Sequence, residues 1–381
     1  MINFHKIFKA YRLLIALTVL YFFIFISFHI TKFLKPFDYK YFGELYSESQ
    51  YIKGQASKRT IGDDGLYAFA GYYYITGGDI SQVNFEHPPL GKYLIGLSEY
   101  IFKNENVINL IYAILFMIVV YKIGQSLLSS KLLAAFSILL VTTDKLVTNQ
   151  YIASQLDLPA SLSFLIGIYF LLKILKRPTL KGSAVATIFF SLSLVMKFFP
   201  FLLLLMFTIL AVLFISKKRK ALLYFGFSSL IFFPLIYLFA HLSYFLHNHS
   251  LLDFIKYQYW IIIWRSGNPF VPGNLFLHLL TGHYFTWYGQ HKTMLSDEWT
   301  LQMPIVFIFG MIGIWLWRKK FENFLISSLV VVNILYATLF TIGQPMYILP
   351  IYPLIAMAAV YTFSEIFKYL KHKNTKTKII S

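Results

Sequence analysis

Cysteine is absent from the 381 residues, so the chain forms no disulfide bond and carries neither a cysteine metal site nor a thiol nucleophile. Charged residues are also scarce, at 13% of the chain, whereas soluble domains have about 25%. Acidic residues number only 16, and neither an internal repeat nor a separate polar domain interrupts the sequence. These absences exclude disulfide scaffolds and ordinary soluble enzymes.

Apolar side chains are what the chain has in excess. It is 58% hydrophobic and 19% aromatic, with a mean hydropathy of +0.64. A helix needs about 20 apolar residues to cross a bilayer core. We count about ten apolar runs, several of which need flanking residues to reach that length: 13–28, 107–121, 132–143, 158–172, 183–196, 198–215, 221–242, 303–317, 324–342 and 346–363. The sequence therefore predicts an all-α polytopic membrane protein that forms a single domain over residues 1–381.

The lysines and arginines are unevenly distributed about these runs. The first run follows Lys6, Lys9 and Arg12 and has no small-residue cleavage site, which is typical of an uncleaved signal anchor with a cytoplasmic N-terminus. Threading the ten runs from there places 21 of the 34 Lys and Arg residues in cytoplasmic pieces, with only two of the 16 acids. The positive-inside rule then predicts that both termini are cytoplasmic. We interpret the basic segments as orientation signals and expect no nucleic-acid binding.

Two long segments lie outside the cytoplasm in this threading, at about 32–105 and about 245–302. The first holds nine of the 16 acidic residues. Within it, residues 88–102 are too few to span the bilayer, and their apolar positions recur at helical spacing. We expect an amphipathic helix there that lies in the outer membrane interface.

The sequence FEHPP at 85–89, the proline corner, leads into that helix through LGKYLIG. Two prolines suit the first turn of a helix, and an ordinary helix start is the alternative explanation for them. A helix N-terminus is also a natural position for an anion, and Lys92 follows one turn later. His87 and Glu86 lie at the mouth of the corner, where they are weak candidates for binding a divalent metal ion.

Three carboxylates stand at expected helix starts. Asp63 and Asp64, in TIGDDGLYAFAGYYY, precede a stretch with helical propensity that includes Tyr67, and Asp157 precedes an apolar run. A carboxylate at the water–lipid boundary can act as a general base, but an acid before a helix also caps free N–H groups. Lys197 lies in an outer hairpin between two runs. There it either extends an apolar stem to the interface or presents an ammonium at the depth of the lipid phosphates.

These motifs resemble those of a known family. D-D-x-x-Y-A at 63–68, followed about twenty residues later by H-P-P-L-G-K at 87–92, is similar to the first outer loop of the protein O-mannosyltransferases and their bacterial relatives. Those enzymes are polyprenyl-phosphate-sugar-dependent glycosyltransferases of the type-C (GT-C) fold. QPMYILPIYPLI at 344–355 resembles their final span, and the W-W-D motif of the oligosaccharyltransferase branch is absent.

The resemblance implies transfer of a sugar such as mannose from a polyprenyl-phosphate donor to an acceptor on the extracytoplasmic face. It implies that Asp63 is the catalytic base, with Asp64 where the family usually has Glu. The residues expected to bind substrate are Tyr67, His87, Lys92, Asp157, Lys197 and Arg265. The family often has an arginine shortly before the matched aspartate, whereas YIASQL precedes Asp157 here.

This chemistry requires no cofactor, because a lipid phosphate is already a good leaving group. The expected partners are the donor lipid, the bilayer and an acceptor that is a protein, a lipid or a glycan. Two alternatives are a transporter or flippase of lipid-linked sugars and a non-catalytic subunit of a glycosyltransferase complex. Transporters often show internal repeats and ionisable groups at mid-membrane, whereas most acids here lie in the two outer segments.

Overall fold

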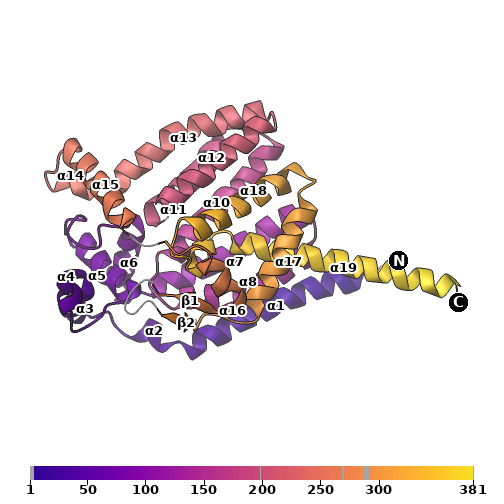
Figure 1. The fold of residues 1–381 in the computed structure, drawn as a ribbon, viewed down its shortest axis with the longest axis horizontal. Coiled ribbons are helices and arrows are strands. Elements are labelled where there is room, and N and C mark those ends of the chain that lie inside the picture. Colours follow the sequence, from indigo (N-terminus) through magenta and orange to yellow (C-terminus); the bar gives the residue numbers. More distant parts are fainter. Residues whose placement is uncertain (1–3, 198, 268–269, 287–291, 381) are drawn as a thin grey trace. The chain divides into compact units, whose positions relative to one another are not determined.

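The structure is a computed structural model that describes residues 4–197, 199–267, 270–286 and 292–380 (Figure 1). The chain divides into two compact units. Unit 1 comprises residues 1–22, 117–147 and 270–381, and unit 2 comprises 23–116 and 148–269. The helices that pass from one unit to the other are α1 (Phe4–Phe28), α7 (Val107–Leu128) and α9 (Lys145–Thr148).

Unit 2 contains the acidic pair, the proline corner, Asp157 and Lys197, whereas the 344–355 motif lies in unit 1. Its other helices are α2 (Thr31–Leu34), α3 (Tyr39–Ser47), α4 (Gln50–Lys53), η1 (Gly54–Ala56), α5 (Asp63–Ile75), α6 (Leu90–Phe102), η2 (Asn149–Tyr151), α10 (Asp157–Lys176), α11 (Leu180–Met196), α12 (Phe199–Ile215), α13 (Arg219–Ala240), α14 (Leu242–Leu246) and α15 (Leu251–Ser266). Helix α11 packs against α10, α12 and α13, and α5 pairs with α6 (Figure 1). All the expected site residues therefore belong to one compact unit.

Unit 1 is built around the C-terminal helices. Its remaining elements are α8 (Lys131–Thr143), α16 (Asn274–Thr281), β1 (His283–Phe285), β2 (Thr293–Leu295), α17 (Gln302–Trp317), α18 (Phe321–Leu339), η3 (Pro345–Ile348) and α19 (Tyr352–Ile380). Helix α19 packs against α17 and α8. The two short strands form an antiparallel hairpin in which Tyr284 pairs with Met294.

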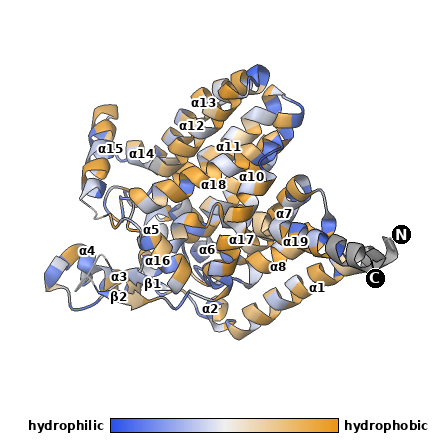
Figure 2. Cartoon of the chain, turned by 45° about the vertical axis from the view of Figure 1, so that its right-hand side comes forward, coloured by the Kyte–Doolittle hydropathy of each residue, from blue (hydrophilic) through white to orange (hydrophobic). Residues whose placement is uncertain are grey.

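The ten apolar runs are helical over most of their lengths. Among the described residues, five helices are long and apolar enough to cross a membrane, and a bent pair near residue 144 would make a sixth; α11, α12 and α17 are shorter apolar helices. Hydrophobic residues dominate α11, α12 and α13 in Figure 2. The prediction of an all-α membrane protein is confirmed, although the run at 346–363 becomes α-helical only at Tyr352. The proline at 350 lacks the N–H that an earlier start would need, and Pro353 fits the first turn.

The second outer segment, expected at about 245–302, contains α15, α16 and the hairpin. It is shared between the units, since residues up to 269 belong to unit 2 and later ones to unit 1. Residues 268–269 and 287–291 of this segment lie outside the described residues.

The packing of α5 on α6 brings the acidic pair and the proline corner into one arrangement. A Cβ atom added to Gly71 would lie 2.5 Å from the carbonyl oxygen of Lys92, and one added to Gly96 would lie 2.1 Å from the carbonyl oxygen of Gly71. The two backbones therefore approach so closely that only glycine fits at the crossing. This contact fixes the start of α5 relative to the start of α6.

Helix α6 is amphipathic, as the sequence predicts, but it begins at Leu90, after both prolines, and Pro89 is its N-cap. Its polar residues face inward: Lys92 is 0% and Glu99 1% exposed. Its outward side carries Leu97, Tyr100, Ile101 and Phe102, each more than 40% exposed. An apolar outer side is the arrangement expected of a helix in contact with lipid.

Candidate active site

The two adjacent aspartates point in different directions from the first turn of α5. Gly62 is the N-cap, and it makes no side-chain capping bond. Asp63 is half-buried, and its Oδ2 accepts a hydrogen bond of 3.3 Å from the Tyr67 hydroxyl one turn later. Asp64 is exposed and borders a different cavity, while its backbone carbonyl accepts a hydrogen bond from Ser154. The first-turn geometry thus separates two chemically identical side chains.

Lys92 is the internal support of the proline corner. Its Nζ donates to the carbonyl and the Oδ1 of Asn84 and, at 2.8 Å, to the carbonyl of His87. The side chain is fully buried, and burial lowers its pKa to about 7. The ammonium is therefore surrounded by acceptors of its own chain, which differs from the phosphate contact that the sequence led us to expect.

Arg265, at the end of α15, donates hydrogen bonds to the same proline corner. Its Nε and Nη2 donate to the carbonyl of Glu86 at 3.0 and 2.7 Å, and Nη2 lies 2.8 Å from Nδ1 of His87. Burial, followed by the charges of Arg265 and two lysines, lowers the pKa of His87 well below its ordinary value. Because Nδ1 accepts from a guanidinium, His87 is a neutral ring that adds no positive charge to the site.

The Asp157–Lys197 pair is the most enclosed ion pair among the described residues. Asp157 is the first residue of α10, and Lys197 follows α11. Oδ2 and Nζ lie 2.6 Å apart, with side-chain exposures of 0% for Asp157 and 5% for Lys197. The same Nζ lies 5.8 Å from the ring centre of Tyr67. Tyr67 therefore connects the acid Asp63 with the Lys197 cation.

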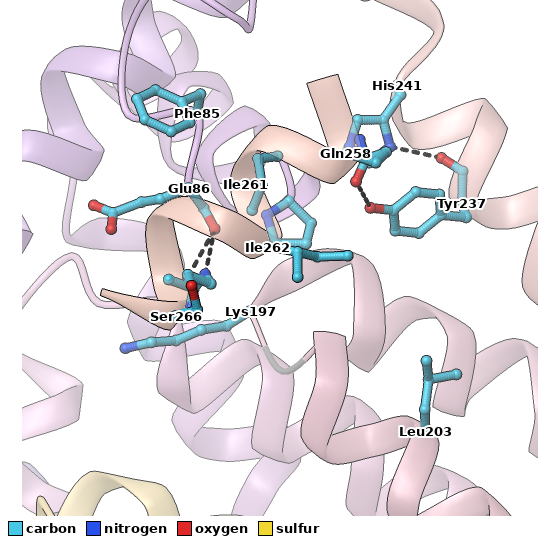
Figure 3. A pocket seen from close by; sticks show the side chains of 12 residues that line it. Phe85, Glu86, Lys197, Leu203, Tyr237, His241, Gln258, Ile261, Ile262 and Ser266 are labelled. Atoms are coloured by element: carbon cyan, nitrogen blue, oxygen red, sulfur yellow. Dashed lines mark hydrogen bonds between the residues drawn. The ribbon is translucent and has the colours of Figure 1, made fainter. Parts of the chain in front are cut away.

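A cavity of about 430 Å³ opens beside these groups within unit 2 (Figure 3). Glu86, Lys197 and Ser266 gather at one end, and Arg265 also lines it. Ile261 and Ile262 lie between this end and a second polar group made by Tyr237, Gln258 and His241, in which the Tyr237 hydroxyl donates to Gln258 Oε1 at 2.6 Å. The cavity is therefore an apolar chamber with one polar end, at which Lys197 and Arg265 lie beside Glu86.

The two candidates for binding a metal ion, Glu86 and His87, make hydrogen bonds to other side chains. Glu86 Oε1 accepts from Asn84 Nδ2 at 3.0 Å, and His87 Nδ1 faces Arg265. Burial raises the pKa of Glu86, although neighbouring cations oppose this. In the described parts of the chain, no group of three or more His, Asp and Glu side chains is placed to hold a metal ion.

Several residues at the site had no recognisable sequence signal. Tyr51, from α4, hydrogen-bonds Asp63, and Tyr237 and Gln258 line the cavity from α13 and α15. They lie far apart in sequence in ordinary aromatic or polar contexts, so neither spacing nor charge distinguishes them. Arg265 was expected from the sequence only as a cation that would balance the phosphate charge, and the structure places it in the last turn of α15.

Comparisons with known proteins agree with this arrangement. A family model described as dolichyl-phosphate-mannose-protein mannosyltransferase matches residues 86–245, which confirms the resemblance for less than half of the chain. The matched part includes the proline corner, Asp157 and Lys197 but begins after Asp63. None of the curated protein sequences matches the chain significantly.

Solved structures match over more of the chain. ArnT from Cupriavidus metallidurans in the apo state has a TM-score of 0.59 at 12% identity, covering 90% of this chain and 59% of that one. ArnT bound to undecaprenyl phosphate has a TM-score of 0.54 at 13% identity, with 90% and 60% covered. The oligosaccharyltransferase AglB from Archaeoglobus fulgidus, in complex with an inhibitory peptide and a dolichol-phosphate, has a TM-score of 0.53 at 13% identity, with 83% and 47% covered.

The shared feature is the fold. At these identities the similarity establishes a GT-C architecture, as the sequence predicts, and an integral membrane protein. The chain spans about 60% or less of the length of these relatives.

Proposed function

We propose that this chain is a membrane glycosyltransferase that moves a sugar from a polyprenyl-phosphate donor to an acceptor on the extracytoplasmic face. The observation that carries the proposal is the cavity with Lys197 and Arg265 at one end and an isoleucine-lined wall beyond them. A polyprenyl phosphate has the matching chemistry, since an anionic phosphate is joined to a long apolar chain. Undecaprenyl phosphate in the ArnT structure and dolichol-phosphate in the AglB structure support this choice.

The transfer needs a base on the acceptor side and positive charge on the leaving-group side. Asp63 accepts the proton of the acceptor hydroxyl, whose oxygen bonds to the anomeric carbon while the bond from that carbon to the phosphate oxygen breaks. The polyprenyl phosphate leaves with one additional negative charge. Lys197 and Arg265 stabilise this charge as it develops. Tyr67 donates to Asp63 and so fixes its orientation.

The remaining candidates position these groups. Lys92 and the neutral His87 hold the proline corner, and Asp157 orients the Lys197 ammonium. We propose mannose as the first sugar to test because the matching family is described by it. Cytoplasmic termini and an extracytoplasmic site follow from the distribution of Lys and Arg along the sequence.

The test compares Asp63→Asn with Asp64→Asn at equal membrane levels, using labelled polyprenyl-phosphate sugars in proteoliposomes. General base catalysis contributes about 10²–10⁴-fold, so turnover of Asp63→Asn should fall by that order. Asp64→Asn removes the same charge at the next residue, and its turnover at saturating acceptor should fall less. If Asp64→Asn is inactive and Asp63→Asn is active, Asp64 is the base and Asp63 is not. Full activity in both variants would exclude the mechanism.

A further inference from the structure

A second cavity in unit 2 borders Asp64 at the start of α5. Its volume is about 340 Å³, and Asp64, Glu105 and Asn106 line it together with Lys32 and Lys35. Asp63 does not line it, nor do the residues of the first cavity. The two cavities therefore share no lining residue, and of the two it is the second that borders the start of α5.

The wall of this cavity is fixed by asparagine side chains. Asn104 Nδ2 donates to the carbonyls of Lys32 and Lys35 at 2.9 and 2.7 Å, and Asn106 Nδ2 donates to the Lys32 carbonyl at 3.3 Å. These bonds join residues about 70 positions apart in the chain. The two lysines are thus held at the cavity, although their side chains are exposed.

Buried acceptor atoms point to a ligand that donates hydrogen bonds. Asn106 is only 4% exposed, yet its Oδ1 has no hydrogen-bond partner among the described residues, and neither has Oε2 of Glu105. A buried acceptor without a partner destabilises the folded protein. Hydroxyl groups of a ligand would satisfy both atoms and the Asp64 carboxylate. Burial, together with the nearby Asp64, raises the pKa of Glu105.

The opposite rim points to an anionic group at the membrane surface. Lys32 and Lys35 line the cavity within a segment whose apolar side chains are strongly exposed: Phe28 by 82%, Ile30 by 44% and Leu34 by 70%. Phe28 also ends a helix that is long and apolar enough to span the bilayer. Lysines interleaved with exposed apolar residues at the end of such a helix are typical of contact with lipid phosphates.

We propose that the second cavity is the acceptor site and that its acceptor is a membrane-anchored amphiphile whose headgroup carries a phosphate and free hydroxyl groups. The phosphate lies at Lys32 and Lys35, the apolar chains lie beside Leu34, and the hydroxyl groups contact Asp64 and Asn106. This inference rests on the proposed function. A further hydroxyl of the headgroup extends out of this cavity, past the first turn of α5, to Asp63. Asp63 takes its proton while the hydroxyl oxygen bonds to the anomeric carbon and the polyprenyl phosphate departs.

Phosphatidylglycerol is the probe, because its headgroup combines a phosphate with a diol. The full chain in phosphatidylcholine vesicles would be photocrosslinked to phosphatidylglycerol with a diazirine in the acyl chain, and the adducts located by peptide mass spectrometry. We expect adducts in residues 28–35, fewer with phosphatidic acid, which lacks the diol, and fewest with phosphatidylcholine. Adducts confined to other segments, or equal labelling by the three lipids, would overturn the proposal.

The matched variants are Lys32→Gln/Lys35→Gln and the control Lys40→Gln/Lys58→Gln, which removes two exposed charges from the same outer segment away from either cavity. Each basic residue at a membrane surface contributes about 1 kcal/mol, so the first variant should crosslink roughly 30-fold less and the control should match the parent. If both double variants crosslink equally, Lys32 and Lys35 do not contribute to lipid binding at this cavity. If polyprenyl phosphate itself labels residues 28–35, the acceptor assignment is wrong.

Crosslinking measures lipid binding at the second cavity and does not depend on turnover. The Asp63→Asn variant therefore separates the proposed acceptor site from the proposed glycosyltransferase function. That variant should retain the adducts and lose transfer, whereas active Asp63→Asn would count against the proposed function alone. The labelled product identifies the acceptor class. Recovery of the sugar in the lipid fraction supports an amphiphile, and recovery in the protein fraction would overturn it.

Discussion

The Asp157–Lys197 pair allows a direct test of which groups contact the donor. Both side chains are almost completely enclosed, and their charged atoms lie 2.6 Å apart. Removing one partner of a buried pair leaves an uncompensated charge and costs about 3–5 kcal/mol. Lys197→Met alone therefore confounds loss of a phosphate contact with structural damage around Asp157.

A double-mutant cycle separates the two effects. We expect Lys197→Met and Asp157→Asn each to lower the thermal stability of the purified protein markedly. The double variant should regain much of that stability, because no charge is then left buried without a partner. If Lys197 also binds the donor phosphate, the double variant still lacks a charged hydrogen bond of about 1.5–3 kcal/mol. Its kcat/KM for the donor should then remain roughly 10- to 150-fold below that of the parent.

Thermal unfolding in detergent and donor-dependent transfer kinetics measure the two quantities on the same preparations. Lys173→Met, which removes a lysine from the other end of α10, is the control for loss of charge. Restored stability together with restored donor kinetics in the double variant would refute the phosphate contact. Lys197 would then serve only as the partner of Asp157.

Three further predictions follow from particular residues. Glu99 is 1% exposed, and burial raises its pKa to about 10; the folded protein keeps this proton while the unfolded chain loses it above about 4.5, so stability falls as pH rises between those values. Glu99→Gln should remove this slope and add about 3 kcal/mol at pH 7, and unchanged pH dependence of the melting temperature would contradict it. Gly96→Ala should destabilise the protein by about 1–3 kcal/mol and lower activity through the α5–α6 contact, whereas Gly226→Ala, with its nearest neighbour at 3.8 Å, should not. In the cysteine-free chain, a Thr60→Cys variant should react with an impermeant thiol reagent from the extracytoplasmic side, and labelling only from the cytoplasm would reverse the topology.

Candidate site residues could be named from the sequence where a charged or conformationally restricted side chain stands in a recognisable motif. Asp63 was singled out by the resemblance of its motif to a known family, and the proline corner and Lys197 by rigid or charged residues next to apolar runs. Lys92 was expected from the sequence as a substrate-binding residue, but its contacts were not predictable, because hydrogen-bond partners depend on how the chain folds around the ammonium. Tyr51 and Asn106 gave no signal, since tyrosine and asparagine are ordinary residues of outer loops.

The sequence alone determined the class of protein and the positions of its apolar helices. Bilayer thickness fixes the length of apolar run that a spanning helix needs, and the scarcity of charge left no soluble alternative. Only the tertiary structure decided that Asp63 and Asp64 serve different surroundings and that Lys32 and Lys35 share a cavity with Asn106. The divergence of the two aspartates depends on the first turn of α5, and the shared cavity depends on hydrogen bonds between residues about 70 positions apart. Such contacts are set by packing in three dimensions, which no local pattern in the sequence records.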